Sequence, residues 1–196
     1  MLQSQLFTKT LKTSPEDEKS INADLLIRAG YIDKLMAGVY TFLPLGLLTL
    51  KKIEKIIREE MLNLGALEIL MPVLQPKNNW QKTSRWDNLD TLFKFTSFYS
   101  KTDLVLGPTH EEVVSPLMKK FVFSYRDLPQ AVFQIQTKFR DEKRPKSGLL
   151  RTREFLMKDL YSFHKDEDDL NSYYEKAKEA YFKIYKRVGL SEITYL

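Results

Sequence analysis

The sequence contains no cysteine and only two histidines, His110 and His164, among its 196 residues. The missing thiols exclude disulfide bonds, zinc thiolate sites and cysteine nucleophiles. Two histidines argue against a metal site built from several imidazole ligands. We therefore expect no metal ligands from the protein itself.

Long apolar runs are also missing. The longest uncharged stretch, residues 35–50, is interrupted by Gly38, Pro44 and Gly46. It is shorter than the roughly 20 residues that a membrane-spanning helix needs. The N-terminus has no basic-then-apolar signal pattern. We therefore expect a cytoplasmic protein.

Charge is abundant and unevenly placed. The chain is 43% hydrophobic and 29% charged, which suits one large soluble domain or two small ones. Its net charge is +5, and Lys138 to Lys158 alone has eight Lys or Arg against three Asp or Glu, a surplus of five. A localised positive surface favours a phosphate-bearing partner. A solvated basic loop is the alternative interpretation.

Two alternating runs around this basic stretch predict a β-hairpin. From residue 131 to 140, apolar side chains occupy odd positions and mainly polar ones even positions, so the two sets lie on opposite strand faces. In the second run, residues 150–164, one face carries arginines, a ring and a carboxylate. The polar face of the first strand has Gln134, Gln136, Lys138 and Arg140, and that of the second has Arg151, Arg153, Phe155, Met157 and Asp159.

Such a hairpin face suits a nucleotide. Arginine forks bind phosphate, a carboxylate accepts from an exocyclic amine, and a ring stacks on a base. A charged hairpin held by cross-strand ion pairs is the alternative. Because Arg140, Arg151 and Arg153 crowd together, we expect an anion between them. The sequence has no glycine-rich phosphate loop of the P-loop or Rossmann pattern.

The remaining elements predict an α+β fold rather than a parallel α/β fold. Helices are predicted from Ser14 through 21–28, over 44–64, from Thr109, and over 166–188. Strands are predicted over 35–43, over 67–74 with a break at Pro72, and as a hairpin over 92–98 and 103–106. Residues 75–91, with Trp80 and Trp86, are expected to be rich in loops.

The stretch Gly107-Pro108-Thr109-His110-Glu111-Glu112 precedes one predicted helix. Thr109 and Glu112 have the spacing of a capping box, which satisfies the first free backbone donors of a helix. Glu111 has no part in that box. A favourable interaction with the helix dipole would explain it without a function.

The hairpin residues resemble a signature motif of a known family. Arg140-x-Glu142 followed by Arg151-x-x-x-Phe155-x-x-x-Asp159 is similar to the second motif of class II aminoacyl-tRNA synthetases. Four further stretches resemble bacterial-type prolyl-tRNA synthetases, in order and over nearly the whole chain: 28–31, 38–46, 107–112 and 158–164. The resemblance implies a class II antiparallel β-sheet flanked by helices.

The resemblance also implies a nucleotide site for ATP. Arg140 would bridge the substrate carboxylate and the α-phosphate of ATP, stabilising charge at the attacked phosphorus. Glu142 would accept from the adenine amino group, and Phe155 would stack on the adenine ring. Arg151 would hold the triphosphate.

For the amino acid, the resemblance implies a proline site. Thr109 and Glu111 would receive the secondary ammonium, which gives Glu111 a role, and Arg140 would contact the carboxylate. His164 would line the amino-acid end of the pocket, with a structural histidine as the alternative. His110 is expected to be structural or exposed.

The implied reaction has two steps. The carboxylate of proline attacks the α-phosphate of ATP to give prolyl-adenylate, and the 3′-terminal ribose of tRNA(Pro) then takes the prolyl group. Catalysis is by positioning and charge stabilisation, with Mg²⁺ bridging phosphates. The helix from Pro44 and the strand to Pro72 look like the first class II motif, which implies a homodimer.

The resemblance ends before the family's third motif, which has no counterpart up to Leu196. Residues 1–196 are therefore expected to be the N-terminal part of a class II catalytic domain with an incomplete sheet, without editing insertion or anticodon-binding domain. Residues 78–79 and 97–101 depart from the family's usual sequence.

Three alternatives remain at this point. One is a threonyl-type enzyme, although its zinc ligands include the cysteine that this chain lacks. The second is a truncated module that binds adenylate, tRNA or a partner without turnover. The third is a basic RNA-binding protein, whose binding would depend strongly on salt but not on ATP or proline.

Overall fold

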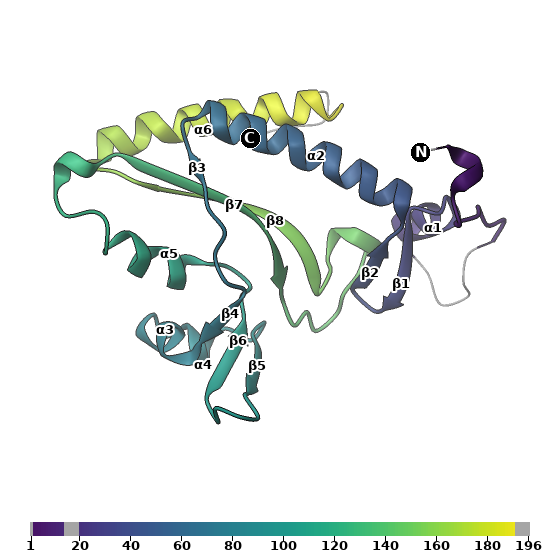
Figure 1. Ribbon diagram of the computed structural model, residues 1–196, viewed down its shortest axis with the longest axis horizontal. Helices are drawn as coiled ribbons and strands as arrows, with labels where there is room; N and C mark the ends of the chain where they lie inside the picture. The colour runs from purple at the N-terminus through teal and green to yellow at the C-terminus, as the bar shows by residue number, and fades with distance from the viewer. Residues whose placement is uncertain (1, 14–19, 191–196) are drawn as a thin grey trace.

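The computed structural model describes residues 2–13 and 20–190, in which two long helices lie along one side of a long strand hairpin (Figure 1). The helices are α1 (Ile21–Arg28), α2 (Pro44–Asn63), α3 (Lys77–Lys82), α4 (Arg85–Asn88), α5 (Glu111–Met118) and α6 (Glu167–Arg187). The strands are β1 (Ile32–Met36), β2 (Val39–Phe42), β3 (Leu67–Glu68), β4 (Leu74–Pro76), β5 (Phe93–Thr96), β6 (Asp103–Leu106), β7 (Gln130–Phe139) and β8 (Glu154–Phe163). The α+β prediction is confirmed.

The long hairpin is formed by β7 and β8, as the alternating runs predicted. The two strands pair antiparallel, with Gln134 opposite Asp159 and Lys138 opposite Phe155. Directly paired residues share one face of a sheet, so these four side chains lie on the same face. The short strand β3 pairs parallel with the other side of β7, so the sheet order is β3-β7-β8.

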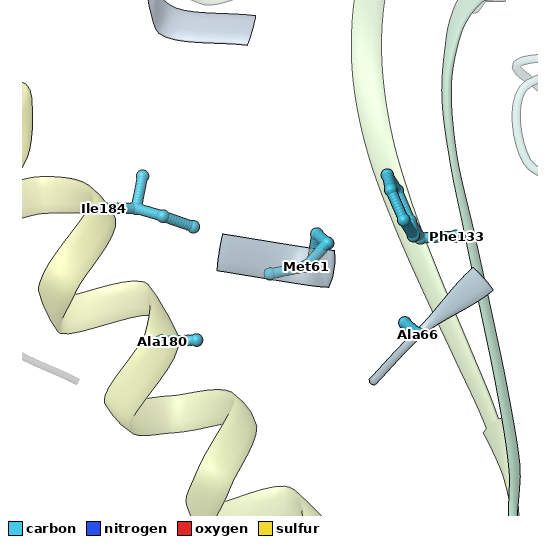
Figure 2. Packing of buried hydrophobic residues seen from close by; sticks show 5 residues of the cluster. All are labelled: Met61, Ala66, Phe133, Ala180 and Ile184. Carbon is cyan, nitrogen blue, oxygen red and sulfur yellow. The ribbon is translucent and has the colours of Figure 1, made fainter. Parts of the chain in front are cut away.

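The apolar face of β7 packs against the two long helices. Helix α2 begins with a proline at its first turn and ends before Gly65, whose φ is +78°, as the sequence predicted. Helix α6 also matches its prediction, and its N-cap Asp166 accepts from the backbone N–H of Asp169. The core between these helices and β7 consists of Met61, Ala66, Phe133, Ala180 and Ile184 (Figure 2).

The polar face of β7 is covered instead of facing water. Gln134 and Lys138 are fully buried. The segment between β3 and β4 lies over them: the backbone N–H of Met71 donates to Gln134 Oε1 at 3.1 Å, and Gln136 Nε2 donates to the Met71 carbonyl at 3.0 Å. An alternating pattern indicates two distinct faces but not what covers them. Arg140, just beyond the strand, is only half-buried.

A second sheet, β4-β6-β5, is antiparallel and confirms the predicted hairpin between residues 92 and 106. The prediction that residues 75–91 are mainly loop was wrong. Helices α3 and α4 form there and bury Trp80 and Trp86 against Leu92 and Val105. The burial of these rings stabilises two helices that are too short to be stable alone.

Near the N-terminus, two further predictions need correction. The single strand expected over 35–43 is a hairpin of β1 and β2 that turns at Gly38, whose φ is +78°. The carbonyl of Gly38 accepts from the backbone N–H of Arg153 at 2.8 Å, so this turn supports the start of β8. Helix α1 begins at Ile21, and the start predicted at Ser14 lies outside the described residues.

The helices in the described part of the chain include none that is both long enough and apolar enough to cross a membrane.

Candidate functional site

Arg140 and Phe155 lie together at the loop end of the β7–β8 hairpin, where Phe139 pairs with Glu154. The backbone N–H of Arg140 donates to the Arg153 carbonyl at 2.8 Å, which continues the pairing beyond β7. The guanidinium carbon of Arg140 lies 5.2 Å from the centroid of the Phe155 ring, a cation–π geometry. Its Nη2 lies 3.5 Å from the Pro108 carbonyl. These contacts fix the plane of a group that has five N–H donors for an anion.

Glu142 and Arg151 form an ion pair beside this arginine. Glu142 Oε2 accepts from Arg151 Nε at 2.8 Å and lies 2.7 Å from its Nη2, and Arg153 Nε donates to the Glu142 carbonyl at 3.1 Å. The alternative interpretation, a hairpin held by ion pairs, is therefore observed for Arg151, whose anion is the buried Glu142. An anion between all three arginines stays a prediction. The pair uses Oε2 of Glu142 and leaves its Oε1 outside this contact.

The loop before α5 is fixed to the same end of β7. The backbone N–H of Phe139 donates to the Gly107 carbonyl at 3.2 Å, and that of Gly107 donates to the Val73 carbonyl at 2.8 Å. A Cβ atom at Gly107 would overlap the side-chain amide of Gln75, so the close approach requires glycine. This attachment brings Pro108 within reach of Arg140.

Thr109 and Glu111 form a polar pair on this loop. Thr109 Oγ1 donates to Glu111 Oε2, and half of the Glu111 side chain is exposed. The predicted capping box was wrong: the N-cap of α5 is His110, and the hydroxyl of Thr109 bonds a carboxylate instead of a backbone donor. Glu112 is turned inward, where its Oε1 accepts from Arg85 Nη1 at 2.9 Å.

A buried polar network lies beneath the loop. Lys138 Nζ donates to Asp159 Oδ2 and contacts His110 Nδ1. His110 Nε2 lies 3.1 Å from the Pro72 carbonyl. A carbonyl only accepts, so Nε2 carries the proton and Nδ1 is the acceptor for the ammonium. The backbone N–H of His110 donates to Tyr161 Oη at 3.1 Å, and Gln134 Nε2 donates to Asp159 Oδ2 at 2.9 Å.

Burial sets the protonation of this network. Desolvation, together with the nearby charge of Lys138, lowers the pKa of His110 to about 4, so the ring is neutral at pH 7. Burial also lowers the pKa of Lys138, against the opposing effect of Asp159. Burial raises the pKa of Tyr161. Of the two interpretations of His110, the structural one is confirmed and the exposed one was wrong, because the ring is fully buried.

The structure does not bring His164 together with the other predicted site residues. His164 follows the far end of β8, five positions beyond Asp159 and nine beyond Phe155. Its Nδ1 lies 3.1 Å from Asp169 Oδ2, and its ring centroid lies 5.3 Å from that of Tyr173. These are the contacts of a histidine that joins β8 to the first turn of α6.

Several residues of the site were not singled out from the sequence. Asp159 closes the second motif, and Lys138 and Tyr161 stand at alternate strand positions, but alternation does not distinguish a buried network from a solvated face. His110 lies inside the recognised stretch 107–112. Arg85 stands out only weakly in the sequence, by its position between Trp80 and Trp86.

No three His, Asp or Glu side chains of residues 2–13 and 20–190 are grouped as a metal cage would require. These residues therefore do not fit a protein-held Mg²⁺ ion. An ion carried on the phosphates of a nucleotide needs no such cage.

Comparisons with known proteins agree on one family. The model of the tRNA synthetase class II core domain (G, H, P, S and T) matches residues 93–195. The proline–tRNA ligase of Dechloromonas aromatica is 49% identical over 191 residues, which are 97% of this chain and 33% of that protein. That of Geobacillus thermodenitrificans is 50% identical over 191 residues, 97% of this chain and 34% of that protein. The chain thus spans about a third of the length of these relatives.

Solved structures show the same fold. The prolyl-tRNA synthetase of Giardia lamblia in complex with prolyl-adenylate aligns with a TM-score of 0.77 at 24% identity, covering 83% of this chain and 34% of that chain. The enzyme of Cryptosporidium parvum with L-proline and AMP aligns with a TM-score of 0.73 at 18% identity, covering 83% and 32%.

Proposed function

Because the chain belongs to the class II tRNA synthetase core-domain family (G, H, P, S and T), we propose that it supplies part of the active site of a proline–tRNA ligase. The observation that carries the proposal is the meeting of two pairs at one end of the hairpin. Arg140 stacked on Phe155 offers an anion site and a ring, and Thr109 with Glu111 offers an ammonium site. The Pro108 carbonyl connects them through its contact with Arg140.

The proposed proline site is the Thr109–Glu111 pair. A secondary ammonium has two N–H donors, which suit a carboxylate and a neutral hydroxyl acceptor. The internal contact uses Oε2 of Glu111, and its other oxygen would accept from the substrate. Arg140 would then hold the carboxylate of proline. The role proposed for His164 gains no support from its position at the far end of β8.

The proposed ATP site is built from the hairpin end. Phe155 would stack on adenine, and Arg140 would contact the α-phosphate. Glu142 has Oε1 outside its pair with Arg151, and that oxygen would accept from the adenine amino group. The triphosphate would then attract the half-exposed guanidinium of Arg151. Each group would keep one internal contact while it gains one from the ligand.

In the proposed reaction the carboxylate oxygen of proline attacks the α-phosphorus of ATP and pyrophosphate leaves. The 3′-terminal hydroxyl of tRNA(Pro) then attacks the prolyl carbonyl, and AMP leaves. The side chains form no covalent bond with the substrates. They align the reactants, and Arg140 stabilises the charge that builds on the phosphoryl oxygens.

The proposal has three wider parts. Residues 1–196 would be the N-terminal part of the catalytic domain. In agreement with this, the chain matches only about a third of the length of its relatives. Helix α2 and the segment from Leu67 to Pro72 would form a homodimer interface, for which the partly exposed Leu47 and Leu48 on α2 are suited. The reaction would take place in the cytoplasm.

Proline-dependent exchange of pyrophosphate into ATP tests the activity. The proposal predicts exchange above the blank without proline, and little with alanine. Binding of proline and ATP without exchange would favour a non-catalytic module, which the limited span of the chain supports as the second candidate. Salt-dependent RNA binding with neither ligand would contradict the proposal.

A further inference from the structure

Arg85 of α4 lies between the two adjacent carboxylates at the start of α5. Its Nη1 is 2.9 Å from Glu112 Oε1 and 3.5 Å from Glu111 Oε2. The Glu112 side chain is fully buried, whereas half of the Glu111 side chain is exposed. The guanidinium of Arg85 therefore contacts one buried carboxylate and one carboxylate that is half exposed to solvent.

The helices α3 and α4 hold this arginine firmly. Its guanidinium carbon lies 5.1 Å from the centroid of the Trp80 ring. Trp80 Nε1 donates to Gln75 Oε1 at 2.9 Å, and Gln75 Nε2 donates to the Thr109 carbonyl at 3.1 Å. Asn79 Nδ2 donates to the Glu112 carbonyl at 3.0 Å. The same unit therefore fixes Arg85 and the backbone on both sides of Glu111.

Arg85, Glu111 and Glu112 together have a net charge of minus one. Glu112 has no exposed side-chain surface and a close contact with Arg85, so it compensates the guanidinium most strongly. Thr83 Oγ1 donates to the same oxygen of Glu112 at 3.0 Å, which holds it in place. Glu111 keeps its charge, and that charge matches a single ammonium.

We propose that Arg85 and Glu112 are a positioning pair for recognition of the substrate ammonium, an inference that rests on the proposed function. Arg85 and Thr109 both hold Oε2 of Glu111, which directs Oε1 toward the ligand. Glu112 cancels the charge of Arg85, so the guanidinium neither neutralises Glu111 nor repels the ammonium. A purely structural ion pair is the competing explanation.

Two variants separate these explanations. Glu112→Gln keeps the shape but leaves the charge of Arg85 uncompensated beside Glu111. The double variant Arg85→Gln/Glu112→Gln removes both charges and restores a net charge of minus one. Neutral replacement of a buried ion pair is usually tolerated. Arg187→Gln is a matched control, because Arg187 of α6 also pairs with two adjacent carboxylates, the buried Glu60 and the more exposed Glu59.

The measurement is isothermal titration of the chain with two ligands. The first is a non-hydrolysable prolyl-adenylate analogue, in which a sulfamate replaces the phosphate, and the second is the adenosine sulfamate without the prolyl group. The ratio of the two affinities isolates the prolyl contribution. We expect Glu112→Gln to lower this ratio about tenfold or more, which corresponds to the loss of one favourable charge contact. We expect the double variant to recover to within about threefold of wild type, and the ratio for Arg187→Gln to be unchanged.

The outcomes distinguish the inference from the proposed function. Wild-type protein that binds neither ligand contradicts the proposed function. Wild-type binding with an unchanged ratio in Glu112→Gln, or a double variant as weak as the single one, overturns the inference alone. If Glu112→Gln does not fold, the double variant Arg85→Gln/Glu112→Gln is measured instead. A ratio of prolyl to non-prolyl affinity more than about tenfold below that of the wild type overturns the proposed charge balance of the pair.

Discussion

The guanidinium carbon of Arg140 lies 5.2 Å from the ring centroid of Phe155, although the two residues are on different strands. The register explains this contact. Phe155 is opposite Lys138, and Arg140 is two positions beyond Lys138 on the same strand face. The hairpin thereby places a planar cation on a ring at its loop end. An arrangement of this kind suits a ligand that has both a phosphate and an aromatic base.

Replacement of Arg140 by alanine tests its proposed role in adenylate formation. We expect the rate of proline-dependent pyrophosphate exchange to fall at least about a hundredfold, because one lost preorganised charge contact costs roughly 3 kcal/mol in the transition state. Arg126→Ala is the control, since Arg126 lies 5.8 Å from the Tyr125 ring in a similar pair. A loss of less than about threefold would sink the assignment of Arg140.

Replacement of Glu111 by glutamine tests the proposed ammonium site. We expect the KM for proline to rise about tenfold or more while the KM for ATP changes less than about twofold, since the amide removes one charge and keeps the shape. Steady-state exchange kinetics with each substrate varied in turn provide both constants. An unchanged KM for proline would show that the ammonium binds elsewhere.

The neutral, buried His110 predicts a dependence of stability on pH. Its pKa is about 4 in the folded state against 6.5 for the free side chain, so below pH 6.5 the unfolded chain binds more protons. The contribution of the neutral His110 to the free energy of unfolding is therefore complete above about pH 6.5 and is lost as the pH falls toward 4. From 1.36 kcal/mol per pKa unit, the loss in unfolding free energy is at most about 3 kcal/mol.

Urea unfolding at several pH values between 7 and 4 measures this effect. His110→Gln is the comparison, because the other titrating groups, including Lys138, Asp159 and Glu111, remain in it. We expect the unfolding free energy of the wild type to fall more steeply with decreasing pH than that of the variant. Parallel curves for the two proteins would contradict a buried neutral His110.

Local patterns were sufficient for the elements that bury one clear face. The apolar spacing of α2 predicted the helix, and the alternation of β7 predicted a strand with one apolar face toward a core. That core contains Met61 and Phe133. The hairpin face with Phe155 also followed from alternation. Glu142 and Arg151, each proposed to contact ATP, lie side by side, and their pairing with each other was not specifically expected.

The remaining features depend on contacts distant in sequence. Helices α3 and α4 have too few residues for a periodic signal, and burial of Trp80 and Trp86 stabilises them. The burial of Gln134 depends on a covering segment more than 60 residues earlier, which alternation does not reveal. The N-cap moves from Thr109 to His110 because His110 is held by Tyr161 and Pro72.

The most direct test of the account is isothermal titration of this 196-residue chain with the non-hydrolysable prolyl-adenylate analogue, beside its alanyl counterpart. The account predicts saturable binding of the prolyl compound and weaker binding of the alanyl one, because the residues of the proposed adenine and ammonium sites lie together at the loop end of the β7–β8 hairpin. A folded chain, verified by circular dichroism, that binds neither compound would contradict the claim that these residues form the activation site.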